Sequence, residues 1–214
     1  MIKLCGVKLS QLPNSSALKE RVDPRWYQAW KAHHGHMRNE RARQLSLGGL
    51  LLLEYLGGAG ELMYADTGRP YLMDGRLDFN ISHTDRQVFC AIVCSDQAGG
   101  RVGLDAETRD HVSDQQAPLL ARRWFSQREY ARFEATPTVD EFLRIWTQKE
   151  ALGKWLGQGL REMRSLDTEC AESTYGVRFY EYTEQDTRIA LCLNVGQLPP
   201  DGVQWLSRAE TDAF

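Results

Sequence analysis

Apolar residues recur at helical spacing in two long stretches of the chain, residues 38–55 and 140–155. Shorter helices are predicted from Asp23-Pro24, over residues 116–124 and after Ser126, where Glu129 three positions on completes a capping box. Runs that alternate, or that are apolar throughout, predict strands over residues 1–12, 61–64, 77–81, 88–95, 101–107, 176–184, 187–195 and 203–206. This mixed order of helices and strands favours an α+β fold over a doubly wound parallel sheet.

Each half of the chain offers one major helix together with hairpin-like strands, although the halves share negligible sequence identity. We therefore expect two similar α+β lobes, a pseudo-dimer. The polar turn Asp96–Gly100 is the natural joint, so the expected lobes are residues 1–98 and 99–214. Ligand clefts are common at such interfaces, and we expect the active site in the cleft between the lobes.

The composition is that of an ordinary globular protein, with 42% hydrophobic and 26% charged residues among 214. The formal net charge of −3 disfavours binding of nucleic acid through bulk electrostatics. Basic residues nevertheless outnumber acidic ones between Lys19 and Arg43, a segment that also contains His33, His34 and His36. Such a segment is usually a solvated face, but it also suits a small anionic ligand or one acidic partner.

The chain contains five cysteines, an odd number that disfavours a disulfide framework in a protein of this length. Cys90 and Cys94 are interpreted as core thiols, because no second Cys/His pair with zinc-ligand spacing follows. No signal peptide is recognised, and no apolar stretch is long enough to cross a bilayer. These observations predict a cytoplasmic protein without a membrane partner.

Two acidic segments carry the candidate chemistry. Asp105 and Glu107 are two residues apart at the end of an apolar run, so on a strand their carboxylates leave the same face. Glu150 and Lys154 are four apart and share one helix face. Converging carboxylates repel each other by roughly 1–4 kcal/mol per pair at 4 Å, which a divalent cation would relieve. Taken singly, each segment is more often a solvated strand end or a surface helix face.

Three other features are weaker signals. Ser82-His83-Thr84 lies in a predicted turn between two strands and offers groups that can bind a phosphate or a base edge. Gly68-Arg69-Pro70 is by itself an ordinary turn. Gly153 lies inside a predicted helix, where glycine costs about 1 kcal/mol relative to alanine. The close approach of a partner or ligand would explain a glycine at this position.

The joint occurrence of these segments in this order resembles the 4'-phosphopantetheinyl transferase superfamily, in its Sfp-like, monomeric two-lobed branch. The resemblance spans roughly residues 38–160 and rests on G-R-P at 68–70, F-N-I-S-H at 79–83, V-G-L-D-A-E at 102–107, F-S-Q-R-E-Y at 125–130 and W-T-Q-K-E-A at 146–151, with Lys154 and Gly157. Ala106 stands where isoleucine is usual, Arg69 replaces a frequent lysine, and Gly48-Gly49 stands where Gly-Arg is common.

The resemblance implies transfer of the 4'-phosphopantetheine arm from coenzyme A to a serine of an apo carrier protein, with release of adenosine 3',5'-bisphosphate. It assigns Mg²⁺ to Asp105, Glu107 and Glu150, the pyrophosphate contact to Lys154, and the base to Glu150, either directly or through water. The coenzyme A contacts it implies are Arg38, Arg41, Arg43, Arg69, Ser82, His83, Lys149 and Lys154.

An acidic carrier protein is the expected partner. Its predicted docking patch contains Arg122, Arg123, Trp124, Phe125 and Arg128. The same residues fit the buried end of a helix equally well. Two rival functions stay open: a metal-dependent phosphodiesterase or nucleotide hydrolase, and a non-catalytic module that binds coenzyme A or a carrier. The sequence names neither the carrier nor its pathway, and a two-lobed chain needs no second copy.

Overall fold

A computed structural model describes residues 1–94, 100–158 and 162–213, and the fold is α+β, as the order of predicted elements indicated. The contacts divide the chain into two compact units. The first comprises residues 1–101 and 198–214, and the second comprises residues 102–197. The expected boundary between residues 98 and 99 lies outside the described residues. The C-terminal segment, expected in the second lobe, belongs to the first unit because its strand Gln204–Trp205 (β9) pairs with Ile2–Lys8 (β1).

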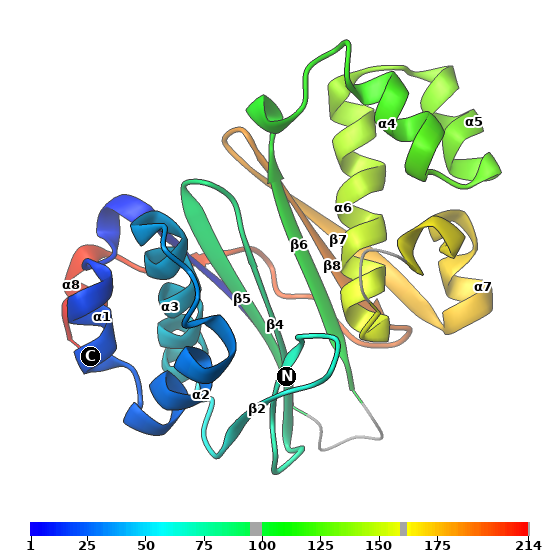
Figure 1. The fold of residues 1–214 in the computed structure, drawn as a ribbon. Helices are drawn as coiled ribbons and strands as arrows, with labels where there is room; N and C mark the ends of the chain where they lie inside the picture. Colours follow the sequence, from blue (N-terminus) through cyan, green and yellow to red (C-terminus); the bar gives the residue numbers. More distant parts are fainter. Residues whose placement is uncertain (95–99, 159–161, 214) are drawn as a thin grey trace. The chain divides into compact units, whose positions relative to one another are not determined.

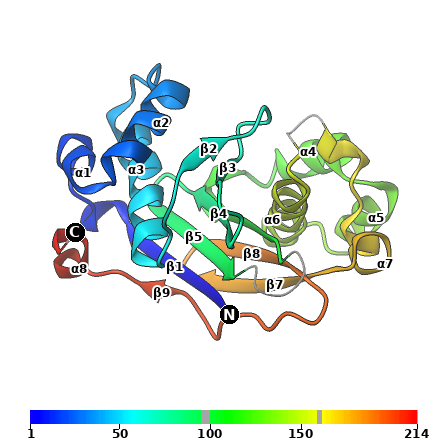
Figure 2. The same cartoon turned by 90° about the horizontal axis from the view of Figure 1, so that it is seen from below.

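The first unit contains a four-stranded sheet with the order β4-β5-β1-β9 and a separate two-stranded sheet. β1 pairs antiparallel with β5, whereas β9 runs parallel beside β1 (Figure 2). The remaining strands are β2 (Leu62–Tyr64), β3 (Pro70–Leu72), β4 (Leu77–His83) and β5 (Gln87–Cys94). The helices are α1 (Ser15–Arg21), α2 (Pro24–His34), α3 (Glu40–Tyr55) and α8 (Arg208–Asp212), with a 3-10 turn at Leu9–Gln11.

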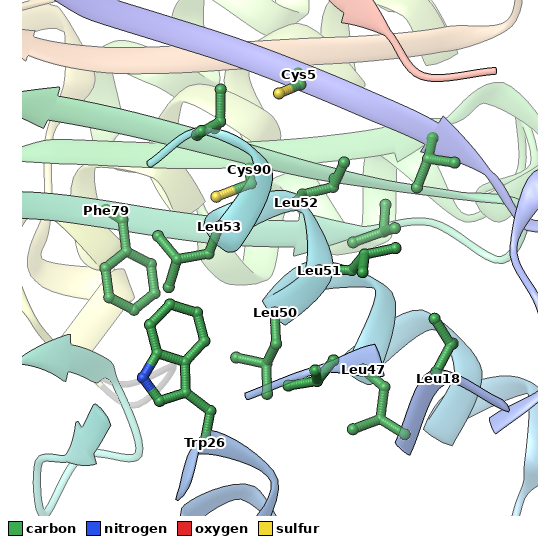
Figure 3. Packing of buried hydrophobic residues seen from close by; sticks show 14 of the residues in the cluster. Cys5, Leu18, Trp26, Leu47, Leu50, Leu51, Leu52, Leu53, Phe79 and Cys90 are labelled. Atoms are coloured by element: carbon green, nitrogen blue, oxygen red, sulfur yellow. The ribbon is translucent and has the colours of Figure 1, made fainter. Parts of the chain in front are cut away.

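The core of the first unit lies between α3 and the sheet. The leucine run 50–53 of α3 is buried, together with Trp26, Phe79 and Cys90 (Figure 3). The helix approaches the sheet closely at Gly49, where a Cβ atom would lie 2.6 Å from Cγ2 of Ile81 on β4. A larger side chain at position 49 would therefore push α3 off the sheet, which gives the Gly48-Gly49 pair a packing reason.

The second unit is an antiparallel three-stranded sheet with the order β6-β8-β7, and its helices gather on one side of that sheet (Figure 1). The strands are β6 (Val102–Thr108), β7 (Val177–Glu184) and β8 (Thr187–Asn194). The helices are α4 (Ala117–Trp124), α5 (Gln127–Ala135), α6 (Val139–Leu156) and α7 (Ala171–Tyr175). Three 3-10 turns occupy Arg109–His111, Glu162–Ser165 and Thr168–Cys170.

The predicted capping box is present at the start of α5. Ser126 Oγ accepts a hydrogen bond from the backbone nitrogen of Glu129, and a carboxylate oxygen of Glu129 accepts one from Ser126 N. Helix α6 ends at Gly157, which adopts the left-handed conformation (φ 73°) typical of a C-terminal glycine. Among the described residues, no helix combines the length and apolar character needed to traverse a bilayer.

Helix α6 packs directly on strand β6 at Gly103. A Cβ atom there would collide with the carbonyl oxygen of Ala151 and lie 2.8 Å from the backbone nitrogen of Trp155. Side chains on a strand alternate between faces, so Asp105 and Glu107 leave the same face as Gly103. The strand therefore presents its two acids to the helix that carries Glu150 and Lys154.

Candidate active site

The two acids of β6 differ in burial. The side chain of Asp105 is only 4% exposed, while that of Glu107, nearer the end of the strand, is 16% exposed. Buried carboxylates are rare unless they are paired or bind a cation. The burial of Asp105 therefore argues against the alternative interpretation, in which the acids lie at a solvated strand end.

Helix α6 supplies the partner of Asp105. The ammonium nitrogen of Lys154 lies 2.6 Å from Asp105 Oδ1, with 29% of the lysine side chain exposed. Burial opposes the charged form of Lys154, but the charges of Asp105 and Glu150 outweigh it and raise its pKa. Lys154 is therefore expected to carry its positive charge at neutral pH.

The carboxylates of the two elements are close enough to influence one another. Burial, followed by the charge of Asp105, raises the pKa of Glu150 to about 7, and Glu107 adds to the repulsion. Burial and then Asp105 also raise the pKa of Glu107. The residues predicted from separate segments are thus brought together within the second unit, where Lys154 and a nearby histidine offset part of the repulsion between the acids.

That histidine, His111, was not singled out from the sequence. Its Nδ1 atom lies 2.6 Å from Oε2 of Glu107, and 68% of its side chain is exposed. The sequence gives little indication of this contact. Residues four apart, such as Glu107 and His111, are expected to meet on a helix, whereas here they lie on the end of β6 and in the following 3-10 turn.

The prediction that Lys149 contacts coenzyme A is wrong. Lys149 is fully buried, and its ammonium nitrogen lies 2.7 Å from Oε2 of Glu129, which is also fully buried. Lys149 also donates to the carbonyl oxygen of Leu166. Neighbouring residues of a helix point about 100° apart, so Lys149 enters the helix interface while Glu150 turns to β6.

The donor set of the site suits a hard divalent cation, which prefers carboxylate oxygens. Three such side chains, Asp105, Glu107 and Glu150, interact electrostatically. Over residues 1–94, 100–158 and 162–213, however, no group of three or more His, Cys, Asp or Glu side chains is already arranged to hold a metal ion. Lys154 occupies one oxygen of Asp105 in this arrangement, so a cation would have to share or replace that contact.

In the first unit, Arg69 is held at the start of β4. Its Nη2 atom donates to both carboxylate oxygens of Asp78, at 3.0 and 2.8 Å, and the arginine side chain is 11% exposed. Ser82 and His83 lie at the other end of the same strand, inside β4 rather than in the predicted turn. Adjacent strand residues leave opposite faces, and accordingly Ser82 is buried whereas His83 is exposed.

The arginines near the start of α3 lie in different surroundings. Arg41 Nε donates to the carbonyl oxygen of Asp85 at 2.6 Å, which brings it to the turn after His83. Arg43 lies 3.4 Å from Glu40, and Arg38 is an exposed residue just before the helix. Of the three, Arg41 is the one that the structure ties to the β4–β5 turn.

The residues of the predicted docking patch differ in their exposure to solvent. Arg122 and Arg123 are exposed on α4, and Arg128 is exposed on α5. Trp124 packs edge-on against Trp146, and Phe125 stacks on Phe142. Both aromatic residues are half-buried, and the guanidinium of Arg123 lies 5.4 Å from the ring centroid of Trp124, so one charged and one aromatic member of the patch are in contact.

A buried strand ending in acids, faced by a helical glutamate and lysine on an α+β scaffold, defines a candidate site for phosphate chemistry assisted by a cation. Comparison with known proteins shows the family of the chain. The model of the 4'-phosphopantetheinyl transferase superfamily matches residues 101–204. The 4'-phosphopantetheinyl transferase AcpT of Escherichia coli O157:H7 is 30% identical over 170 residues, which are 77% of this chain and 83% of AcpT.

Other relatives match over shorter stretches. The 4'-phosphopantetheinyl transferase HetI of Nostoc sp. is 31% identical over 142 residues, so the match spans 60% of this chain and just over half, 57%, of HetI. The 4'-phosphopantetheinyl transferase Sfp of Bacillus subtilis is 33% identical over 97 residues, 44% of this chain and 39% of Sfp. The chain belongs to the 4'-phosphopantetheinyl transferase superfamily, a family of transferase enzymes, as its motifs predicted.

Proposed function

We propose that the protein transfers the 4'-phosphopantetheine arm of coenzyme A to a serine hydroxyl of an apo carrier protein, in a Mg²⁺-dependent reaction that releases adenosine 3',5'-bisphosphate. The observation that carries this proposal is the proximity of Asp105, Glu107, Glu150 and Lys154 within the unit that the family model matches. The relatives are 4'-phosphopantetheinyl transferases, and three carboxylates beside a lysine are groups that such a transfer could use.

In the proposed reaction, the serine oxygen attacks the phosphorus that bears the pantetheine arm. A new serine oxygen–phosphorus bond forms while the bond to the leaving phosphate breaks. Glu150 accepts the serine proton directly or through water. Its pKa of about 7 belongs to the ion-free site, and a bound cation would lower that pKa, which favours the route through water. Lys154 faces the leaving phosphate and offsets the charge that grows on it.

A divalent cation held by Asp105, Glu107 and Glu150 would neutralise the charge on the pyrophosphate oxygens. The protein's part is to keep these three carboxylates close despite their repulsion. The packing of α6 on Gly103 does so, because it fixes the helix register that sets Glu150 and Lys154 against the strand.

The remaining coenzyme A contacts are proposed in the first unit. Arg41 contacts the β4–β5 turn, and Ser82 and His83 are the last two residues of β4. The guanidinium of Arg69, which directly precedes β3, binds Asp78 near the start of β4. Asp78 and His83 are five positions apart, about 17 Å along a strand, so the two ends suit an elongated ligand. Arg38 and Arg43 are proposed contacts of the 3'-phosphate.

The proposed coenzyme A contacts come from both units. We propose that the two units are the lobes of a pseudo-dimer, with coenzyme A in the cleft between them.

The proposed partner is an acidic acyl or peptidyl carrier protein that docks on Arg122, Arg123 and Arg128. We propose further that the protein acts as a monomer in the cytoplasm. The decisive experiment incubates it with coenzyme A, Mg²⁺ and a panel of apo carriers, and reads the added arm by mass spectrometry. Release of free phosphopantetheine without any carrier would instead support a phosphodiesterase. Equal activity of the parent and of Glu150→Gln would contradict the assigned site.

A further inference from the structure

The strand that carries Asp105 and Glu107 continues directly into a 3-10 turn that ends at His111. The turn is fixed at its start, because the backbone nitrogen of Arg109 donates a hydrogen bond of 3.0 Å to the carbonyl oxygen of Asp186 in the β7–β8 hairpin. His111 therefore projects from a backbone that is tied to the sheet.

The contact between His111 and Glu107 is short and directional. Nδ1 of the imidazole lies 2.6 Å from Oε2 of the carboxylate, within the range of a charge-assisted hydrogen bond. An ionised carboxylate can only accept, so in that state of Glu107 the proton is donated by Nδ1. One oxygen of Glu107 is thereby held, which restricts rotation of the whole carboxylate group.

Glu107 has a particular need for this restraint. It lies near the end of β6, and 16% of its side chain is exposed compared with 4% for Asp105. A glutamate has three rotatable side-chain bonds and its last torsion is broad. Without a hydrogen bond from outside the acidic group, repulsion from Asp105 would favour rotamers that point away from the site.

We propose that His111 is a positioning residue for Glu107, which orients that carboxylate toward the cation site through the Nδ1–Oε2 hydrogen bond. The inference rests on the proposed function in one respect, because Glu107 is taken there as a cation ligand. In this role His111 acts through Glu107 and is not itself assigned a contact with the cation or the substrate. Hydrogen-bonded partners of metal ligands commonly change metal affinity or activity by roughly 10–100-fold when they are removed.

The test measures binding of Mn²⁺ alone to the protein by isothermal titration calorimetry, followed by the Mg²⁺ dependence of carrier modification. We expect His111→Ala to raise the dissociation constant for Mn²⁺ and the half-saturating Mg²⁺ concentration by roughly 10–100-fold. Saturating Mg²⁺ should restore much of the rate. His111→Asn places an amide nitrogen close to the position of Nδ1, so it should recover most of the affinity.

A matched control is His36→Ala, which removes another exposed histidine from the first unit and should leave Mn²⁺ binding unchanged. Thermal unfolding of both variants shows whether they are folded. The assignment is overturned if His111→Ala binds Mn²⁺ as tightly as the parent, or if His111→Asn is no better than His111→Ala. A parent protein that neither binds Mn²⁺ nor modifies any carrier would instead overturn the proposed metal site, and this assignment with it.

Discussion

The ammonium group of Lys149 lies 2.7 Å from Oε2 of Glu129, and neither side chain has any solvent exposure. The other carboxylate oxygen of Glu129 accepts hydrogen bonds from both the backbone nitrogen and the hydroxyl of Thr168. This network joins α5, α6 and the segment before α7 one residue away from Glu150. It fixes the helix that carries the proposed base, although it contributes no group to the site.

Removal of one partner of this pair should destabilise the second unit strongly, because the remaining charge would stay buried without its partner. We expect Lys149→Met or Glu129→Gln to lower the free energy of unfolding by about 3–5 kcal/mol. Urea unfolding followed by tryptophan fluorescence would measure the change. Glu172→Gln, which breaks the exposed pair with Arg178, is the control and should not shift the midpoint measurably.

The same comparison would separate two explanations of the K-E pair in the W-T-Q-K-E-A segment. A lysine that contacts a phosphate would lower coenzyme A affinity when it is replaced, with little loss of stability. The buried position of Lys149 predicts the reverse order of effects. A variant of normal stability with a raised KM for coenzyme A would contradict the structural role.

Gly103 and Gly153 should respond in opposite ways to alanine. A Cβ at Gly103 collides with the backbone of α6, so Gly103→Ala should cost about 1–3 kcal/mol or more and move Glu150 away from β6. A Cβ at Gly153 would lie 3.5 Å from Met163, an ordinary contact, so Gly153→Ala should gain up to about 1 kcal/mol. Thermal unfolding of both variants is the measurement. Equal destabilisation by both would argue against this packing.

These positions show what the sequence could and could not predict. The α+β class, the two long helices and the proximity of Asp105 to Lys154 followed from apolar periodicity and from motifs. The burial of Lys149 against Glu129 could not be predicted in this way. Helical spacing gives the relative directions of residues 149, 150 and 154, but it does not show which of them faces α5. The sequence suggested a close approach at Gly153, because glycine is unfavourable inside a helix. The close approach in the structure is instead at Gly103 on β6. His111 depends on a turn geometry that has no periodic signal.

Reversal of charge on α4 tests the proposed carrier surface. Arg122→Glu combined with Arg123→Glu should raise the apparent KM for an acidic carrier by roughly tenfold and leave the KM for coenzyme A unchanged, because charges at an interface rim act mainly on encounter. The difference should shrink at high salt, where exposed charges are screened. Arg164→Glu, an exposed arginine elsewhere in the unit, is the control. Equal changes in both KM values would contradict the docking role.

The raised pKa of Glu150 predicts proton release when a cation binds. Burial and neighbouring acids hold this pKa at about 7, above its ordinary value of 4.5, so the group is partly protonated at pH 6.5 and almost fully ionised at pH 8.5. A cation favours the ionised form and should expel a substantial fraction of one proton at pH 6.5 and little at pH 8.5. Calorimetry in two buffers of different ionisation enthalpy measures the number of protons released for each cation bound. Glu150→Gln should remove most of the release, and an equal release at both pH values would contradict the prediction.

The same shift makes the ion-free protein sensitive to pH. A carboxyl group whose pKa is higher in the folded state contributes stability that is complete below pH 4.5 and is lost as the pH rises toward and through 7. Stabilisation by Mg²⁺ should therefore be larger at pH 8 than at pH 6, which thermal unfolding with and without the ion would show.

Lys154 should act in opposite directions on cation binding and on transfer. In the ion-free arrangement its ammonium group lies 2.6 Å from Asp105, so it competes with a cation for that oxygen. Lys154→Gln removes a positive charge from the site and should tighten Mn²⁺ binding by roughly tenfold, a modest share of the Coulomb energy of two charges at this range. The rate of carrier modification should nevertheless fall, because the leaving phosphate loses its counter-charge. Lys154→Arg keeps the charge but changes its shape and should restore weak metal binding without restoring the full rate. If Lys154→Gln instead weakened Mn²⁺ binding, the lysine would have to support the carboxylates rather than compete for them, and its assignment to the phosphate would fail.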